Sequence, residues 1–200
     1  MMFRLFRFDK KFYQRSDGTQ YIAGVDEAGR GPLAGPVVAA AVILPAGFRL
    51  KNLADSKKLT EIQREKFYQQ ISNRALCIGI GAVSERVIDR INILRATFKA
   101  MRIAIGKLNI KPDLILVDGP FEIPNLNVPQ KAIIAGDSQS AAIACASIIA
   151  KVTRDRVMYK LDRKYPRYCF CRNKGYPTKE HKGAIKLYGL TEIHRKSFSW

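Results

Sequence analysis

Three short apolar runs in this chain of 200 residues lead into acidic residues. The first stops on the adjacent carboxylates Asp26 and Glu27, and the other two lead to Asp118 and Asp137. A single aspartate at such a place is usually a turn former or a helix cap. Several carboxylates at one edge of a sheet would repel one another unless a cation neutralised them. Because hard oxygen ligands suit Mg²⁺ or Mn²⁺ better than zinc, these four residues predict a divalent-metal site.

Glu27 presents a difficulty, because adjacent residues of a regular strand point to opposite faces of the sheet. Two explanations are open: the strand ends at Asp26, or Glu27 acts through its main-chain carbonyl.

Asp155 competes for a place in this set. It follows Asp137 by 18 residues, which corresponds to about 27 Å along a continuous helix. Both cannot serve one pair of metal ions about 4 Å apart. We expect Asp155 to pair with a neighbouring arginine on a helix surface.

The turn after the first two acids is Gly29-Arg30-Gly31. Glycine at the outer positions allows positive φ and lets main-chain N–H groups approach a ligand closely. Arg30 adds a fixed fork of donors that suits phosphate. The turn is not a dinucleotide-binding fingerprint, because Pro32 and the apolar residues after it predict a second strand and not a helix.

The charge of the chain predicts a polyanionic partner. The net charge is +18 and the isoelectric point is about 10, which favours nucleic acid first and an anionic membrane second. Residues 151–200 hold 14 basic and 4 acidic residues. We therefore expect much of the phosphate-binding face in this last quarter, with Lys57, Lys58 and Lys174 among the cations that hold a nucleic-acid backbone.

Several other classes of protein are disfavoured. No segment reaches the ~20 apolar residues of a membrane span, and residues 1–12 lack the apolar core of a secretory signal. They fit a short basic amphipathic lead-in better than an organelle presequence. The four cysteines lack paired metal-ligand spacing, and His181 and His194 have no recognisable triad partners. We expect reduced thiols and a cytoplasmic location.

Periodicity and turn signals predict alternating strands and helices after an initial pair of strands. This order predicts an α/β sandwich around a mixed sheet. Thr60 and Gln63 form a capping-box pattern before the first of the core helices, and residues 167–177 read as a basic aromatic loop. We expect one structural unit with a lead-in (1–20), a catalytic core (21–165) and a substrate-binding extension (166–200). The expected strands cover 21–26, 36–44, 76–83, 114–117 and 131–135, and the expected longer helices cover 61–72, 91–108, 138–165 and 178–188.

Residues 24–36, with the sequence GVDEAGRGPLAGP, resemble the signature of bacterial type 2 ribonuclease H (ribonuclease HII). Further blocks resemble that family in the same order, and the resemblance spans residues 21–198. Only 25 residues precede Asp26, so type 2 fits better than the related type 3 enzymes with their additional N-terminal domain. The further blocks are 55–59, 117–119, 136–138, 144–155, 174–178 and 194–198.

The resemblance implies a ribonuclease H-like α/β fold with a small helical C-terminal part. It implies cleavage of the RNA strand of RNA–DNA hybrids and nicking of DNA 5′ to a single embedded ribonucleotide. The family's four catalytic carboxylates fall on Asp26, Glu27, Asp118 and Asp137, its 2′-OH-sensing motif on Gly29, Arg30 and Gly31, and its junction-sensing tyrosine on Tyr176. At Ala135 the family usually has lysine, and this departure concerns a phosphate contact and not the metal site.

We therefore expect a monomeric endonuclease that uses two Mg²⁺ or Mn²⁺ ions and leaves 3′-OH and 5′-phosphate ends. Its roles would be removal of ribonucleotides and RNA primers. One rival reading is a non-catalytic basic nucleic-acid-binding protein, which gives no reason for acids to end three strands. A second is a nuclease of the same fold that cuts another substrate, such as a DNA junction. The aromatic end of the chain gives no convincing sliding-clamp peptide.

Overall fold

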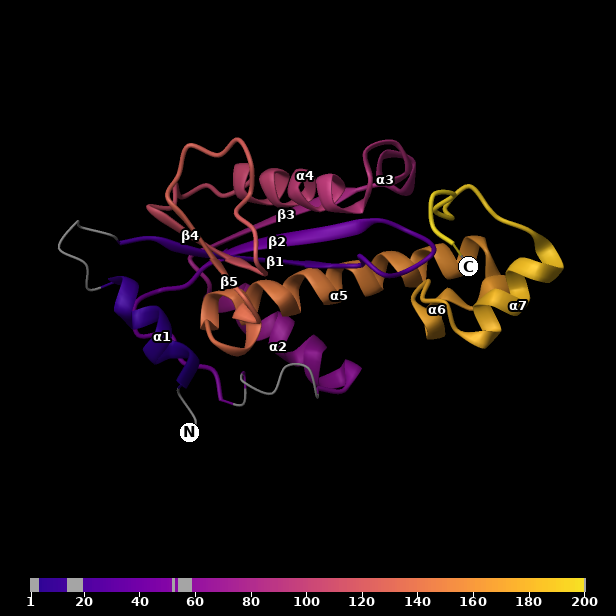
Figure 1. The fold of residues 1–200 in the computed structure, drawn as a ribbon. Helices are drawn as coiled ribbons and strands as arrows, with labels where there is room; N and C mark the ends of the chain where they lie inside the picture. Colours follow the sequence, from indigo (N-terminus) through magenta and orange to yellow (C-terminus); the bar gives the residue numbers. More distant parts are fainter. Residues whose placement is uncertain (1–3, 14–19, 52, 54–58, 200) are drawn as a thin grey trace.

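The computed structural model describes residues 4–13, 20–51, 53 and 59–199, drawn in colour in Figure 1. Among these residues, five strands form one mixed sheet in the order β3-β2-β1-β4-β5. The central strand β1 pairs antiparallel with β2 and parallel with β4. The expected mixed sheet is thus confirmed. The strands are β1 (Ile22–Ala28), β2 (Val37–Ile43), β3 (Cys77–Val83), β4 (Leu114–Asp118) and β5 (Gln130–Ile133).

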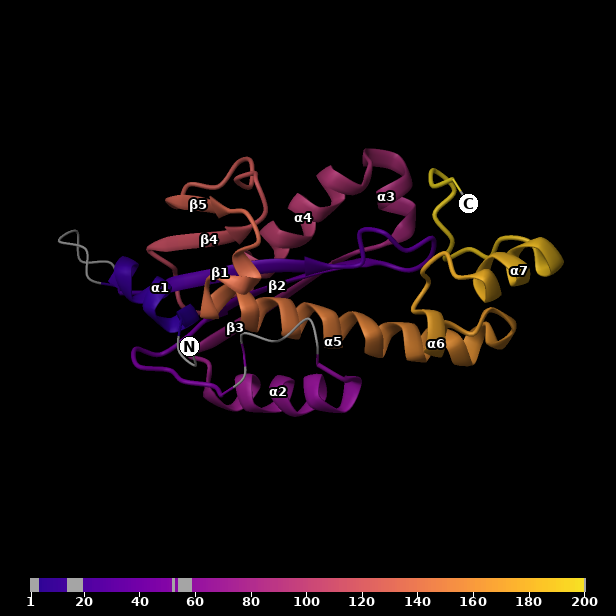
Figure 2. The same ribbon diagram turned by 60° about the horizontal axis from the view of Figure 1, so that its bottom comes forward.

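Helices cover both faces of the sheet (Figures 1 and 2). The long helix α5 lies along β1 and β2 on one face, with α1 and α2 beside it, and α3 and α4 lie on the other face. Beyond the end of α5, the chain turns back through the short elements that precede α7. The helices are α1 (Arg4–Tyr13), α2 (Glu61–Arg74), α3 (Glu85–Ile91), α4 (Ile93–Gly106), α5 (Ala141–Lys164), α6 (Phe170–Asn173) and α7 (Lys179–Tyr188), and the 3₁₀ turns are η2 (Gly136–Ser138) and η3 (Pro166–Tyr168).

Each face of the sheet packs against its own hydrophobic core, because successive side chains along a strand point to opposite faces. In β2, Ala40 and Val42 pack with α2 and α5, whereas Ala39, Ala41 and Ile43 pack with α4. Because both faces are covered, the whole strand is buried and reads as a continuous apolar run.

Helix α5 lies unusually close to β1 at Gly24. A Cβ atom on Gly24 would fall 2.1 Å from the backbone carbon of Ala142, a distance that no real contact allows. A residue without a side chain is therefore required where the first turn of α5 crosses the strand. This contact fixes the helix against the strand that carries the first two acids.

Some expected boundaries are wrong. The helix expected from residue 138 begins at Ala141, after the separate turn η2, and the expected loop 167–177 overlaps η3 and contains α6. The lead-in contains α1, whose Asp9 Oδ2 accepts a 2.9 Å hydrogen bond from the Ala142 N–H and so caps α5. The capping box of Thr60 and Gln63 is confirmed. The division into lead-in, core and extension stays a prediction.

Within the described ranges, no helix combines the length and the apolar character that crossing a bilayer requires.

Candidate active site

Asp26 and Asp118 lie side by side on neighbouring parallel strands. Val25 of β1 is paired with Val117 of β4, so the two aspartates that follow occupy equivalent positions. Residues in register on parallel strands point to the same face, and the charge of Asp118 acts on Asp26. The sheet register therefore brings these two acids together, as the strand-end argument predicts.

Asp137 reaches the same region by a different route. Strand β5 ends at Ile133, and Asp137 lies in η2, so the expectation that it ends a strand is wrong. The Gly136 N–H donates a 2.6 Å hydrogen bond to Asp118 Oδ1, and a Cβ on Gly136 would come within 3.2 Å of that oxygen. The turn is thereby held against Asp118, and the buried Asp137 follows it directly.

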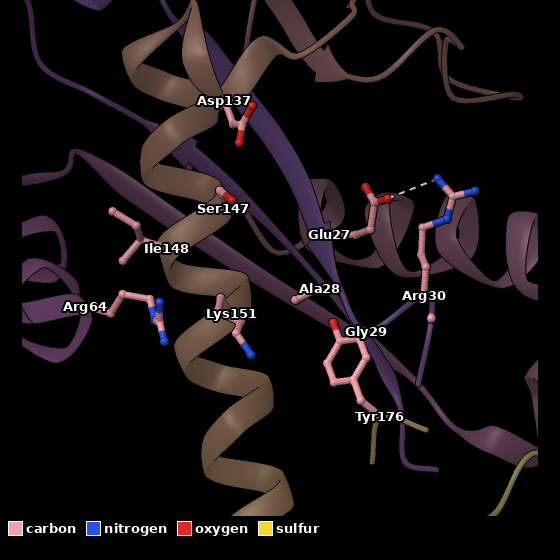
Figure 3. A pocket seen from close by; sticks show the side chains of 11 residues that line it. Glu27, Ala28, Gly29, Arg30, Arg64, Asp137, Ser147, Ile148, Lys151 and Tyr176 are labelled. Carbon is pink, nitrogen blue, oxygen red and sulfur yellow. Dashed lines mark hydrogen bonds and ion pairs between the residues drawn. The ribbon is translucent and has the colours of Figure 1, made fainter. Parts of the chain in front are cut away.

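Glu27 lies inside β1, because that strand continues to Ala28. The explanation that the strand ends at Asp26 is therefore wrong. The Glu27 N–H donates a 2.7 Å hydrogen bond to Asp26 Oδ1, and Glu27 Oε1 lies 3.3 Å from Arg30 Nη1. Figure 3 shows Glu27 turned toward Arg30, on the side of β1 away from Asp137. The alternative role for its main-chain carbonyl stays a prediction.

Burial and mutual repulsion act on these carboxylates. Asp26 is only 5% exposed, and burial followed by the charges of Glu27 and Asp118 raises its pKa well above the ordinary value. Burial is also the main reason that the pKa of Glu27 is raised, while the Arg30 guanidinium opposes this shift. The Ser147 hydroxyl on α5 hydrogen-bonds Asp26 and favours its charged form. A cation at this place would relieve the repulsion.

A pocket of about 460 Å³ adjoins these acids. Glu27 and Asp137 line it together with the Gly29-Arg30-Gly31 turn and Tyr176. Figure 3 shows the labelled residues among them around the pocket. Polar side chains that sequence reasoning missed also line it: Arg64, Ser147 and Lys151. Ser147 and Lys151 are four residues apart on α5 and share one helix face. That spacing could have drawn attention to them once the helix was placed beside Asp26.

The two glycines of the turn differ in backbone conformation and in the space around them. Gly29 has φ +97°, and a Cβ there would fall 2.1 Å from Nε of Arg154, so both conformation and space require glycine. Gly31 does not adopt the positive φ that glycine allows. A Cβ on Gly31 would lie 3.7 Å from the Tyr176 ring, which is an ordinary van der Waals contact.

Tyr176 and Lys174 have different surroundings. Tyr176 is 41% exposed and lines the pocket, which is compatible with contact to a ligand. Lys174 is buried: its ammonium hydrogen-bonds the Cys171 carbonyl and lies 3.8 Å from the centre of the Tyr159 ring. A phosphate contact by Lys174 requires its side chain to leave these partners. Lys57 and Lys58 lie outside the described residues.

Asp155 takes no part in the group of acids. Its Oδ1 accepts from Lys151 Nζ at 2.7 Å, four residues earlier on α5, and the side chain is buried. The expectation of an arginine partner on a helix surface is therefore wrong, whereas its separation from the other acids agrees with the helix-length argument.

The donor set has the chemistry that a hard divalent cation requires. Four carboxylates lie at one end of the sheet, and the charges of Asp26, Glu27 and Asp118 act on one another. Among the residues with described positions, no three His, Cys, Asp or Glu side chains are already gathered as metal ligands. The acids therefore fit a metal by type and place, and binding would have to draw their oxygens together.

Sequence comparisons with known proteins identify one family. The family model described as Ribonuclease HII matches residues 23–200. A protein of Acetivibrio thermocellus named Ribonuclease HII is 55% identical over 192 residues, which are 96% of this chain and 74% of that protein. One of Syntrophus aciditrophicus with the same name is 56% identical over 191 residues, 96% of this chain and 89% of that protein.

Solved structures are similar in fold over nearly the whole chain. The ribonuclease H2 of Pyrococcus horikoshii OT3 is 30% identical, with a TM-score of 0.73 over 89% of this chain and 93% of that one. The ribonuclease HII of Archaeoglobus fulgidus, in a complex with PCNA, is 27% identical, with a TM-score of 0.75 over 90% of this chain and 96% of that one.

Proposed function

Because this chain belongs to the ribonuclease HII family, and is thus a hydrolytic nuclease that cleaves RNA–DNA hybrids, we propose a finer activity for it. It nicks duplex DNA on the 5′ side of a single embedded ribonucleotide and leaves 3′-OH and 5′-phosphate ends. Its biological roles would be the excision of misincorporated ribonucleotides and the removal of RNA primers.

One observation carries this proposal: a group of acids adjoins a loop of exposed backbone in one pocket. Asp26 and Asp118 are neighbours in the sheet register, and Glu27 and Asp137 line the pocket that the Gly29-Arg30-Gly31 turn closes. Acids alone would suit many metal-dependent hydrolases. The adjacent loop adds a means to recognise the sugar, because main-chain groups can contact the 2′-OH that distinguishes RNA from DNA.

The four carboxylates would hold two divalent cations, Mg²⁺ or Mn²⁺. When bound, such ions activate a water molecule for in-line attack and stabilise the leaving 3′ oxygen. Asp26 is oriented by the Glu27 N–H and by Ser147, and Asp118 by the Gly136 N–H. These bonds preset two of the four carboxylates before any ligand arrives, which lowers the cost of gathering them.

The neighbouring residues would hold the substrate. The Gly29-Arg30-Gly31 backbone contacts the 2′-OH, and Tyr176 packs against the same sugar and positions it. Lys57, Lys58 and Lys174, with other cations of the basic C-terminal part, hold the duplex backbone, so affinity should fall steeply with salt. A monomer and a cytoplasmic location remain our expectations. A sliding clamp is a candidate partner, supported only by the Archaeoglobus complex with PCNA.

The test is cleavage of a labelled DNA duplex with one ribonucleotide, in Mg²⁺, Mn²⁺ or EDTA, beside an all-DNA control. We expect a metal-dependent nick just 5′ of the ribonucleotide and an intact control. Salt-sensitive binding to every duplex without cleavage would favour the rival reading as a binding protein. Cleavage of a DNA junction but not of the ribonucleotide duplex would favour a nuclease of the same fold with another substrate.

A further inference from the structure

One buried arginine, Arg195, hydrogen-bonds the main chain of the glycine turn. Arg195 is 1% exposed, and its guanidinium donates four hydrogen bonds, all to main-chain carbonyls. Nη2 donates to Gly29 O at 2.6 Å, and Nη1 donates to Arg30 O at 3.0 Å. Nε and Nη2 also donate to Gly35 O, at 3.0 and 2.8 Å. One rigid fork thus joins the glycine turn to Gly35, two residues before β2.

These bonds decide which way the N–H groups of the turn point. In a trans peptide, the C=O and the N–H of one unit point in opposite directions. The unit that contains Gly29 O also contains the N–H of Arg30, and the unit that contains Arg30 O also contains the N–H of Gly31. Because Arg195 holds both carbonyls on its own side, both N–H groups are directed away from it.

The other side of the turn is the pocket. Gly29, Arg30 and Gly31 all line it, and Tyr176 lines it beside Gly31. Within the part of the chain that the structure describes, neither the Arg30 N–H nor the Gly31 N–H donates to a main-chain carbonyl. Two adjacent donors are therefore offered to a ligand, and they are held by bonds to a residue that the ligand does not touch.

The charge of Arg195 strengthens these donors. Burial and the nearby Arg154 guanidinium lower the pKa of Arg195 to about 9, so it stays positive at neutral pH. No carboxylate in the described residues forms an ion pair with it at contact distance. A carbonyl that accepts from a cation polarises its peptide and makes the N–H of that peptide a better donor.

We propose that Arg195 is a positioning residue for ribose recognition: it orients and polarises the Gly29–Arg30 and Arg30–Gly31 peptides, so that both N–H groups meet the 2′ oxygen. This inference rests on the proposed function, because it concerns the same pocket and the same substrate. Arg195 touches no substrate. Its contribution is to the choice between ribose and deoxyribose, and it acts through the backbone of the turn.

Arg154 supplies a matched control. It is equally buried and also donates only to carbonyls, those of Pro36, Lys174 and Ala34, at 3.0, 3.0 and 3.1 Å. None of these carbonyls belongs to a peptide whose N–H comes from Arg30 or Gly31. Arg154 also lies against Gly29 and 6.0 Å from the centre of the Tyr176 ring, and the control is therefore Arg154→Lys, which keeps a positive charge there. This variant removes the same kind of bonds but leaves the two donor peptides attached to Arg195.

The experiment compares Arg195→Lys, Arg195→Gln and Arg154→Lys with the unaltered protein in one nicking assay. KM is measured for a duplex with one ribonucleotide, and the all-DNA duplex of the same sequence is added as a competitor to give its inhibition constant. The ratio of inhibition constant to KM reports discrimination, and it does not depend on the fraction of folded enzyme. Thermal unfolding of each variant is followed separately.

We expect both Arg195 variants to lower this ratio about tenfold, the factor that belongs to one hydrogen bond, chiefly through a higher KM for the ribonucleotide duplex. Lysine should not rescue it, because one ammonium cannot replace a fork that spans two peptides. Arg154→Lys should lower the unfolding temperature and keep the ratio. An unchanged ratio in both Arg195 variants, or an equal fall in Arg154→Lys, overturns the inference. If the unaltered protein does not prefer the ribonucleotide duplex, the proposed function is contradicted as well.

Discussion

The Nε2 atoms of His181 and His194 lie 3.1 Å apart inside the C-terminal part of the chain, and one tautomer assignment makes this contact a hydrogen bond. His181 Nδ1 must carry a proton, because it lies 2.9 Å from Tyr176 O, which can only accept. His194 Nδ1 must accept, because the Thr191 N–H donates to it at 2.9 Å. The remaining proton is therefore on His194 Nε2, which donates to His181, and both rings are neutral.

The first prediction concerns stability against pH. Burial, and then the neighbouring His181, lower the pKa of His194 from 6.5 to about 4, and burial also lowers the pKa of His181. As pH falls, the unfolded chain therefore binds the extra proton before the folded protein does. The contribution of the neutral pair to the unfolding free energy is fully present above pH 6.5 and is lost as pH falls through 4. The expected slope of the unfolding free energy is about 1.4 kcal/mol per pH unit for each proton.

Chemical denaturation at a series of pH values measures this slope. Asp9 works in the opposite direction, because burial raises its pKa to about 6, and so the wild-type curve alone is ambiguous. The difference between wild type and His194→Gln isolates the histidine, since Asp9 is present in both. Parallel curves for the two proteins between pH 4 and 6.5 would show that the pair does not titrate as argued.

The second prediction concerns Asp118. Asp118→Asn removes a negative ligand, yet its side-chain oxygen can still accept the hydrogen bond from the Gly136 N–H. We expect cleavage to fall by more than about 100-fold, with hybrid binding and the unfolding temperature preserved. Asp113→Asn is the matched control, because Asp113 accepts from backbone N–H groups at the opposite end of β1. Metal-dependent activity retained in Asp118→Asn would remove this residue from the site.

The third prediction concerns the contact between β1 and α5. In Gly24→Ala, the new methyl group would fall 2.1 Å from the Ala142 backbone, so the helix must move away. Overpacking of this kind costs about 1–3 kcal/mol, and we also expect reduced cleavage because Asp26 and Ser147 are moved apart. Gly183→Ala is the comparison: it lies in α7 with open space around its Cβ, and should stabilise by about 0.5–1 kcal/mol. Equal unfolding temperatures for the two variants would contradict the steric argument.

The fourth prediction concerns Tyr176. The residue is 41% exposed and lines the pocket, so Tyr176→Ala should leave the unfolding temperature almost unchanged. Loss of the surface that positions the sugar should lower kcat/KM by about 10–100-fold. Tyr21→Ala, a ring of similar exposure beside the start of β1, should leave kcat/KM intact. If both variants keep full activity, Tyr176 has no role in positioning the substrate.

Local signals in the sequence were sufficient for much of this structure. The capping box of Thr60 and Gln63 depends on residues three positions apart, and it is present as expected. The convergence of Asp26 and Asp118 could be foreseen as well, because acids near the ends of strands in one sheet can meet at one edge, although β1 continues two residues beyond Asp26. The sequence also predicts Asp137 in this region, but by assuming that it ends a strand. It lies instead in η2, beyond the end of β5.

Contacts between distant parts of the chain could not be foreseen. The bond between Arg195 and Gly29 joins residues 166 positions apart, and nothing in the periodicity near either residue indicates it. The burial of Lys174 depends in the same way on Tyr159, which belongs to another element. Local patterns specify elements and their ends, whereas such contacts depend on the angle and register with which whole elements pack.

The dependence of the glycine turn on Arg195 also has a consequence for biosynthesis. Ribosomes add roughly 5–20 residues per second from the N-terminus, so the 166 residues that separate Gly29 from Arg195 take roughly 10–30 s to make. Strands β1 and β2 are translated early and can pair while the rest of the chain is still being made. The turn between them can bind the Arg195 guanidinium only after residue 195 has been made, so a nascent chain carries the first acids of the site long before the backbone beside them has its final shape.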